Sequence, residues 1–489
     1  MIARVKFFSG LWLGCALSMA ALAQNEFSAG PIYAEFPLTL SSGQREEAAG
    51  PFFSREHAGP ERQISVPPLF TWTRDEDIDS AKLDSLYPIL TYSRYGAEYR
   101  FQFFQLFSFA GGKTQEENHR RRFTLFPIYF QQRAPDPKFN YTAVLPFYGH
   151  LQNRLFRDDI KFVMFPFYSE TRKKDIVTDN YVFPFFHLRH GNELRGWQFW
   201  PLVGSEQKGI TYRTNAVDEL ETIAGHEKFF ALWPFYFRDR LGIGTDNPED
   251  HRAIIPFYTR LRSPKRDSTS YGWPFGFTVT DEREKKYRET DLFWPLFVRA
   301  RGEGKTTTRI FPFYSRASNT NLESDFYMWP LYKFNRLKAP SLDRQRTRIL
   351  FFLYSDISEK NLEAKAEFRR IDFWPLFTSR RDWDGNERLQ ILSIIEPVLP
   401  NAGGIGRNYA PLYSLWRAEK NAKTGAASQS LLWNLYRRDT TLATKKISLL
   451  FGLFQYQSTP EGKNWRVCYF HLGKKTVPEK VSQPKAPQP

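Results

Sequence analysis

The sequence predicts an all-β protein, folded as an antiparallel meander of roughly 20 repeated strands. Two observations lead to this fold class. Aromatic residues make up 17% of the 489 residues, which is typical of a chain with a large packed core. A short apolar cluster centred on proline also recurs along most of the chain, and the segments between clusters are rich in turn-forming residues.

The cluster has a constant form, seen in Phe126-Pro127-Ile128-Tyr129 and Phe165-Pro166-Phe167-Tyr168. Seventeen copies lie between residues 127 and 452, at a mean spacing of about 20 residues. Their central residues are Pro127, Pro146, Pro166, Pro184, Pro201, Pro234, Pro256, Pro274, Pro295, Pro312, Pro330, Phe352, Pro375, Pro397, Pro411, Asn434 and Gly452. The series extends backwards through Leu106, Pro88 and Pro68.

We interpret each cluster as the middle of one strand of about ten to twelve residues, followed by a polar turn. Proline in nearly every apolar run disfavours helices. Because a strand–helix–strand crossover needs about 30 residues, consecutive strands are expected to pair antiparallel. Trp and Phe alternate before the central residue from Trp294 to Trp374, as expected if the strands run alternately up and down. Proline cannot donate a ladder hydrogen bond, so this interpretation requires a repeated bulge or kink.

Successive side chains of a strand point to opposite faces, and the apolar residues of one cluster fall on both faces. This indicates that both faces of the sheet are covered. Phe293, Pro295 and Phe297 share one face, while Leu292 and Trp294 lie on the other. A large closed β-barrel in an outer membrane is the preferred architecture, because the strand length, the meander and an export signal all agree with it. A propeller or stacked-sheet array and a β-solenoid are the alternatives.

The chain divides into four predicted segments. Residues 1–23 have a charged start, an apolar stretch and a small-residue cleavage site at Ala21-Leu22-Ala23, and are predicted to be a signal peptide. Residues 24–67 are expected to be a linker or N-terminal arm, residues 68–472 a single β-repeat domain, and residues 473–489 a disordered tail. The protein is thus expected to be exported, to the outer membrane or alternatively to the periplasm or medium. Leu13-Gly14-Cys15 leaves lipidation as a rival interpretation of the leader.

Composition favours anionic partners and disfavours most catalytic chemistry. The formal net charge is +16, and cleavage after Ala23 removes Arg4 and Lys6 to leave +14. Anionic lipid or acidic glycan is the expected partner, whereas export argues against nucleic acid. Only Cys468 would remain after cleavage, so no intrachain disulfide is expected. The sequence contains no zinc-ligand motif, nucleophile elbow or P-loop, so no catalytic, cofactor-binding or metal-binding residues are predicted.

A recurring arginine is the one candidate binding feature. Arginine stands six residues after the central residue in eight copies, at Arg133, Arg172, Arg240, Arg262, Arg301, Arg336, Arg381 and Arg417. Such a row would suit phosphate or carboxylate groups. The structural explanation is that long cations flank apolar strands and limit aggregation.

These observations together predict a non-enzymatic, bacterial-type cell-envelope protein, an outer-membrane β-barrel with a structural or transport role. The alternative is a soluble periplasmic or secreted β-repeat protein that binds glycans or protein partners.

Overall fold

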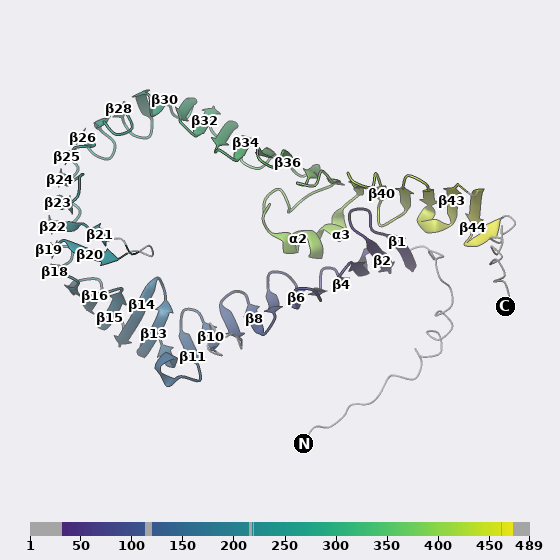
Figure 1. Cartoon of the computed structure of the whole chain (residues 1–489), viewed down its shortest axis with the longest axis horizontal. Coiled ribbons are helices and arrows are strands. Elements are labelled where there is room, and N and C mark those ends of the chain that lie inside the picture. Colours follow the sequence, from purple (N-terminus) through teal and green to yellow (C-terminus); the bar gives the residue numbers. More distant parts are fainter. Residues whose placement is uncertain (1–31, 113–119, 215–217, 219, 461, 473–489) are drawn as a thin grey trace, which may run out of the picture.

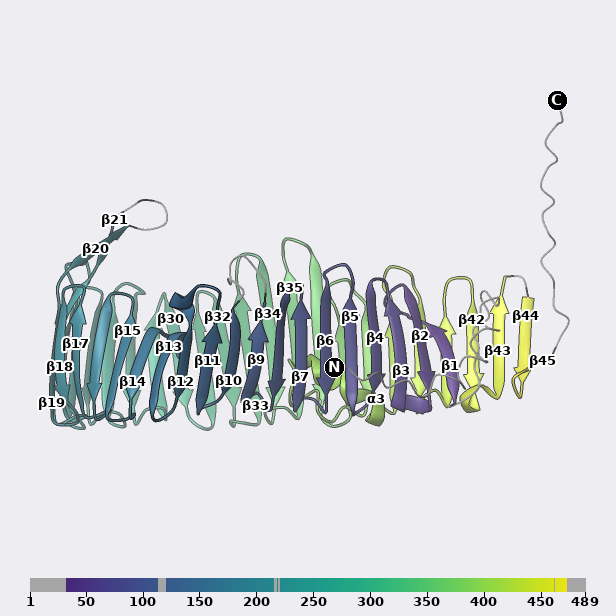
Figure 2. The same ribbon diagram turned by 90° about the horizontal axis from the view of Figure 1, so that it is seen from below.

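A single antiparallel meander sheet makes up nearly the whole molecule, which confirms the predicted fold class. The computed structural model describes residues 32–112, 120–214, 218, 220–460 and 462–472. Within them, 43 strands form one sheet and β20 and β21 form a second, two-stranded one. The large sheet winds once around a wide ring, with the strands standing side by side (Figures 1 and 2). The predicted signal peptide and C-terminal tail lie outside the described residues.

The odd-numbered strands of the large sheet all run away from the same rim of the ring. They are β1 Tyr33–Pro37, β3 Phe53–Ala58, β5 Phe70–Asp75, β7 Leu90–Tyr95, β9 Phe107–Gly111, β11 Tyr129–Arg133, β13 Tyr148–Arg154, β15 Tyr168–Lys173, β17 Phe186–Gly191, β19 Val203–Lys208, β23 Tyr236–Ile243, β25 Tyr258–Arg262, β27 Phe277–Glu282, β29 Phe297–Gly302, β31 Tyr314–Asn319, β33 Tyr332–Lys338, β35 Tyr354–Asn361, β37 Phe377–Arg381, β39 Trp416–Lys420, β41 Tyr436–Thr440, β43 Phe454–Thr459 and β45 Phe470–Leu472.

The even-numbered strands run back towards that rim. They are β2 Gly43–Ala48, β4 Glu61–Val66, β6 Ser80–Ser85, β8 Glu98–Phe103, β10 Arg121–Leu125, β12 Tyr141–Val144, β14 Arg157–Val163, β16 Ile176–Tyr181, β18 Leu194–Phe199, β22 Gly225–Ala231, β24 Glu249–Ile254, β26 Arg266–Tyr271, β28 Tyr287–Leu292, β30 Lys305–Ile310, β32 Leu322–Tyr327, β34 Leu342–Ile349, β36 Ala366–Phe373, β38 Glu387–Ile391, β40 Ala427–Leu431, β42 Lys445–Leu449 and β44 Gly462–Val467. The separate hairpin is β20 Thr211–Thr214 with β21 Leu220–Ile223.

The proline clusters form turns between strands, so the prediction that they are strand centres is wrong. β28 ends at Leu292 and β29 begins at Phe297, which leaves Phe293-Trp294-Pro295-Leu296 as the turn. The amide of Leu296 donates to the carbonyl of Phe293 at 2.8 Å. The bond before Pro295 is cis, as it is before thirteen other prolines, which is the geometry of a type VI turn. Each repeat therefore contains two short strands, and the sheet has about twice the predicted number.

Neighbouring proline turns are joined to one another by backbone hydrogen bonds. The amide of Phe183 donates to the carbonyl of Pro166 at 2.7 Å, and that of Trp329 to the carbonyl of Pro312 at 2.7 Å. The ladder thus continues through the turns with proline taking part through its carbonyl, so the missing N–H does not interrupt it, which removes the objection to proline in a sheet. All these turns lie along one rim, which we call the proline rim; the other rim is the polar rim. The Trp–Phe alternation consequently does not report strand direction.

Two predicted repeat centres belong to an insertion. Residues 392–415 replace the turn between β38 and β39 and contain α2 (Gly403–Asn408) and α3 (Ala410–Tyr413). Pro411 lies in α3, and Pro397 lies in the segment before α2. Both helices lie inside the ring (Figure 1). Phe352, Asn434 and Gly452, by contrast, lie in turns of the proline rim.

The expected N-terminal linker is also part of the sheet. Within residues 24–67, the segment from Tyr33 to Val66 forms β1 to β4, paired in the same antiparallel order as the rest. Its strands, such as Gly43–Ala48, are charged rather than apolar, which is why composition alone suggested a linker. Ladder hydrogen bonding to β5 keeps them in the sheet.

The two faces of the sheet differ because the sheet is curved. Asp84 accepts a hydrogen bond from Arg407 of α2 at 3.1 Å, which identifies its face as the concave one, towards the ring interior. Side chains converge on this face, and many of them are small and buried, such as Ser65, Thr71 and Ser315. The largest apolar cluster on it joins Phe130, Tyr141, Ala143, Leu151 and Phe162 of β11 to β14.

The ring closes where its two ends overlap with their concave faces together. The guanidinium of Arg437 lies 3.5 Å from the ring centroid of Phe36, and Asn434 Nδ2 donates to Glu47 at 2.5 Å. Among the described residues no ladder joins β1 to β45, so side-chain packing, and not strand pairing, holds this overlap. The ring is therefore not closed by the continuous ladder of the predicted barrel, and its single sheet does not divide into propeller blades.

Candidate functional site

The proline rim exposes large apolar side chains around the ring. The residue after each cis-proline is Phe, Leu or Ile, and it is exposed in thirteen of the fourteen turns. Phe257 and Phe275 are the extremes, at 74% and 66% exposure. The thirteen are Leu69, Ile128, Phe147, Phe167, Phe185, Leu202, Phe235, Phe257, Phe275, Leu296, Phe313, Leu331 and Leu376. The turns that carry these residues lie along the lower margin of Figure 2.

A row of apolar side chains on the convex face adjoins these turns; we call it the convex belt. It consists of the first residue of each odd strand and the last residue of each even strand, which are ladder partners, except that β6 ends in the polar Ser85. Tyr314, Tyr327 and Tyr332 are consecutive members, with ring centroids 5.5 and 5.7 Å apart. Tyr168–Tyr181 and Tyr258–Tyr271 repeat the 5.5 Å spacing elsewhere in the ring. Cross-strand aromatic pairs of this kind stabilise a sheet edge.

The residues before the prolines cover the concave side of the same rim. The rings of Phe311 and Trp329 lie 5.6 Å apart, as do those of Trp200 and Trp233. Phe311 also contacts the buried Phe326 of the concave face, with centroids 6.1 Å apart. The rim is therefore apolar at its tip and on both sides.

Polar residues begin again one row above the convex belt. The third residue of four of the five odd strands from β23 to β31 is an exposed arginine, at Arg238, Arg260, Arg299 and Arg316, and only β27 has Val279 there. At about 3.3 Å per residue, the apolar zone from turn tip to belt is roughly 7–10 Å deep. The site is thus a shallow apolar edge bordered by cations.

The arginines predicted to bind anions lie elsewhere. Seven are the fifth residue of an odd strand and point to the convex face near the polar rim. Arg301 donates to the carbonyls of Ala300 and Thr307, and Arg133 bonds its own hairpin in the same way. Arg336 binds Asp343 through two hydrogen bonds. The structure does not bring this row together with the aromatic rim.

Arg417, the eighth predicted arginine, differs because it follows the insertion. It is the second residue of β39 and lies on the concave face, in the overlap that closes the ring. Burial, with Arg45 beside it, lowers the pKa of Arg417 to about 10. It remains a cation at neutral pH.

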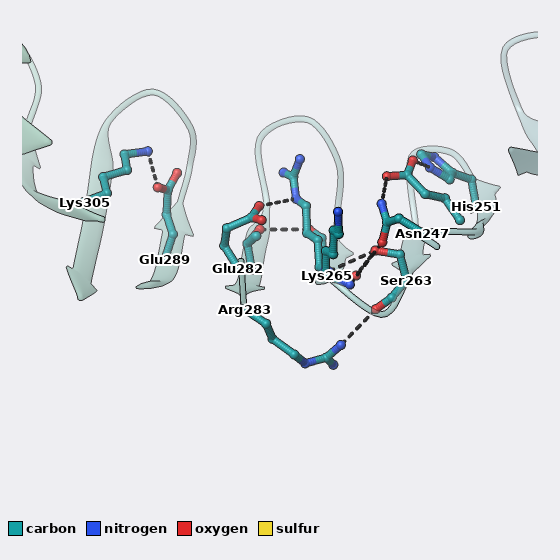
Figure 3. A network of polar contacts seen from close by, with 12 residues as sticks. Asn247, His251, Ser263, Lys265, Glu282, Arg283, Glu289 and Lys305 are labelled. Carbon is teal, nitrogen blue, oxygen red and sulfur yellow. Dashed lines mark hydrogen bonds and ion pairs between the residues drawn. The ribbon is translucent and has the colours of Figure 1, made fainter. Parts of the chain in front are cut away.

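The polar rim is held by side-chain hydrogen bonds between neighbouring turns. Arg283 donates to the carbonyl of Ser263 at 2.8 Å, and the amide of Lys265 donates to Asn247 Oδ1 at 3.1 Å (Figure 3). Lys305 forms an ion pair with Glu289 in the same region. Single apolar side chains are exposed here too, but they do not form a continuous row.

The aromatic cluster was predicted from the sequence, but as the centre of a strand and not as an exposed turn. The arginines one row above the belt were missed, although they recur four residues after Pro234, Pro256, Pro295 and Pro312. Among the described residues, no group of His, Cys, Asp and Glu could hold a metal ion. None of the described helices is long and apolar enough to cross a bilayer. No protein-family model matches the chain, and a search of curated proteins finds no relative.

Proposed function

We propose that this protein is an exported, non-enzymatic component of the cell envelope that binds a membrane surface through its proline rim. The ring would stand upright on the membrane, with the polar rim and the β20–β21 hairpin pointing away from it. The enclosed interior would then serve a structural or transport role. The observation that carries the proposal is the continuous exposed apolar edge, because contiguous patches of this kind mark interaction surfaces.

The depth of the apolar zone favours insertion into one membrane interface. Interfacial elements bury their apolar face about 5–10 Å deep, which matches the turn tip plus the convex belt. Spanning a bilayer with strands takes about 9–11 residues each. The strands here have three to eight residues and carry polar side chains beyond the belt.

The residue types at the rim also suit a membrane interface. Trp and Tyr, such as Trp233, Trp294 and Tyr314, have amphipathic rings that favour the headgroup level. Arg299 and Arg316, one row above the belt, would reach lipid phosphates. Anionic lipid is therefore the proposed partner.

The test is vesicle binding by the purified mature chain, measured by flotation. A triple variant with Phe147→Ser, Phe167→Ser and Phe185→Ser removes three neighbouring rim residues, and we expect at least about tenfold weaker binding because each buried phenyl ring contributes favourably. The control variant, Leu155→Ser, Phe156→Ser and Leu442→Ser, removes three exposed apolar residues from the polar rim and is expected to bind like the parent protein.

Two kinds of vesicle separate the apolar and electrostatic parts of the binding. We expect phosphatidylglycerol vesicles to bind more tightly than phosphatidylcholine vesicles, and only the former to lose affinity with added salt. A parent protein that floats with neither vesicle would overturn the proposal. That result would favour the alternative, a soluble β-repeat protein that binds glycans or protein partners.

A further inference from the structure

A group of cations that forms no ion pair within the described residues lies on the concave face of β33 and β34. Lys333 and Arg348 are direct ladder partners, and Arg346 stands two residues before Arg348 on the same face. All three residues are half-buried, and the ladder register places them on the same face as Asp84, which is the concave one. Like charges directly opposite one another in a sheet destabilise it. The arrangement therefore needs an explanation beyond folding.

The acids nearest to this group on the concave face are engaged elsewhere. Asp372 of β36 accepts from Arg370 at 2.9 Å and from Thr378 at 2.8 Å. Glu359 of β35 forms an ion pair with Arg344 at 2.9 Å. Among the described residues, no side-chain hydrogen bond or ion pair involves Lys333, Arg346 or Arg348, and the buried Nε of Arg346 has no hydrogen-bond partner.

The electrostatics of the three cations agree with this geometry. Burial, followed by the charge of Arg348 and then of Arg309, holds the pKa of Lys333 below its ordinary value. Burial and the charges of Arg348 and Arg344 likewise lower the pKa of Arg346. The charged forms of Lys333 and Arg346 are thus disfavoured, and a bound anion would offset this for both.

We propose that Lys333, Arg346 and Arg348 form an anion-binding site inside the ring for a ligand with two or more adjacent phosphate groups. Cross-strand partners have Cβ atoms about 4.5–5.5 Å apart, and residues two apart along a strand are separated by about 6.6 Å. Three cations at these separations match linked phosphates better than one monovalent anion. The guanidinium groups supply paired donors, and Lys333 supplies a point charge. This site is distinct from the proline rim and from the eight arginines predicted from sequence.

Isothermal titration calorimetry of the full mature chain with sodium tripolyphosphate tests the site. We expect saturable binding that falls by about tenfold or more in the double variant Lys333→Gln with Arg348→Gln, because each charge-assisted hydrogen bond contributes to affinity. The control is Arg288→Gln with Lys360→Gln, which removes one Arg and one Lys from the convex face. The control and the test variant therefore have the same net charge. No binding, or equal weakening in both variants, would overturn the proposal.

Thermal unfolding provides a second readout that does not depend on affinity alone. Without ligand, the Lys333–Arg348 double variant should melt at a higher Tm than the parent, because a like-charge contact is removed. With tripolyphosphate, the parent Tm should rise and the variant Tm should not. A variant that is less stable than the parent without ligand would show that the cations are structural, and would count against the site.

A third arm distinguishes a soluble ligand from a lipid headgroup. Short-chain phosphatidylinositol 4,5-bisphosphate, kept below its micelle concentration, carries two adjacent phosphate groups on a lipid headgroup. Competition with tripolyphosphate in the parent, but not in the double variant, would assign the site to phosphorylated headgroups; lack of competition would assign it to soluble polyphosphates. Because both probes are used without vesicles, failure here is separable from failure of membrane binding.

Discussion

The same strands form both rims of the ring, but the turns at the two rims differ in length and in side-chain chemistry. Turns at the proline rim repeat one geometry and one chemistry, with an apolar residue at the tip. Turns at the polar rim vary in length, and β20–β21 extends beyond them (Figure 2). The insertion of residues 392–415 arises at the proline rim, yet α2 and α3 lie inside the ring (Figure 1), and the lower edge of the molecule is nearly level (Figure 2). A level apolar edge suits contact with a flat surface, whereas the other rim has no such constraint.

The largest expected effect contrasts a buried residue with one at the rim. Leu151 is 1% exposed, in the concave cluster, and Leu151→Ala should lower the free energy of unfolding by about 3 kcal/mol, through lost burial and a cavity. Phe167, 61% exposed at the proline rim, should tolerate Phe167→Ala within about 0.5 kcal/mol. Urea unfolding measures both. Equal losses of unfolding free energy would mean that the exposed rim aromatics stabilise the fold as much as the buried cluster does. The proposed difference between the two regions would then not hold.

The next largest effect on stability is expected from a buried carboxyl group close to the proline rim. Asp291 of β28 is 9% exposed on the concave face, and its Oδ1 has no hydrogen-bond partner. Burial, and then the carboxylate of Glu289, raises the pKa of Asp291 to about 6. Between the ordinary carboxyl pKa and this value the folded chain retains a proton that the unfolded chain releases, so stability falls as pH rises and levels off above about pH 6.

Substitution by Asn isolates this contribution. Asp291→Asn should remove that part of the pH dependence and raise stability at neutral pH, by up to about 3 kcal/mol at the usual conversion of 1.36 kcal/mol per pKa unit. Tm measured from pH 4 to pH 8 checks it. A variant with the same Tm-against-pH profile as the parent would contradict the prediction.

A smaller effect is expected where the rim motif departs from proline. Asn434 occupies a proline position, has φ of 69°, and donates to Glu47 across the overlap that closes the ring. Asn434→Gly keeps this left-handed conformation accessible and removes only the amide, so we expect about 1 kcal/mol lower stability. Small-angle scattering should show a larger radius of gyration as the overlap loosens. An unchanged radius with unchanged stability would show that the contact does not hold the ring closed.

The smallest effect is expected from the polar rim. Replacing residues 210–224, which include β20 and β21, by a short Gly-Asn turn should leave Tm and vesicle binding close to those of the parent, because the hairpin forms a separate sheet. Inserting the same segment between Pro295 and Leu296 should strongly reduce vesicle binding. Similar behaviour at both rims would remove the distinction between them.

Much of the fold was predictable because its signals are local. Aromatic and β-branched runs between turn residues indicate strands, and a repeat too short for a crossover indicates a meander. The second strand of each repeat was missed because each repeat was assigned one strand and one polar turn, whereas a further turn, such as the one between β29 and β30, makes two strands per repeat. Proline has no N–H to donate to a strand ladder, and the structure places it in the turn between two strands and not at a kink within one strand.

The sequence by itself determined the all-β class, the antiparallel order and the period, since these depend on neighbouring residues. The tertiary structure decided that the aromatic clusters share one edge, that Lys333 and Arg348 face each other across the concave side, and that Phe36 meets Arg437 to close the ring. These depend on the curvature accumulated over the whole sheet and on contacts between residues hundreds of positions apart. Local patterns do not encode where such a sheet brings its two ends together.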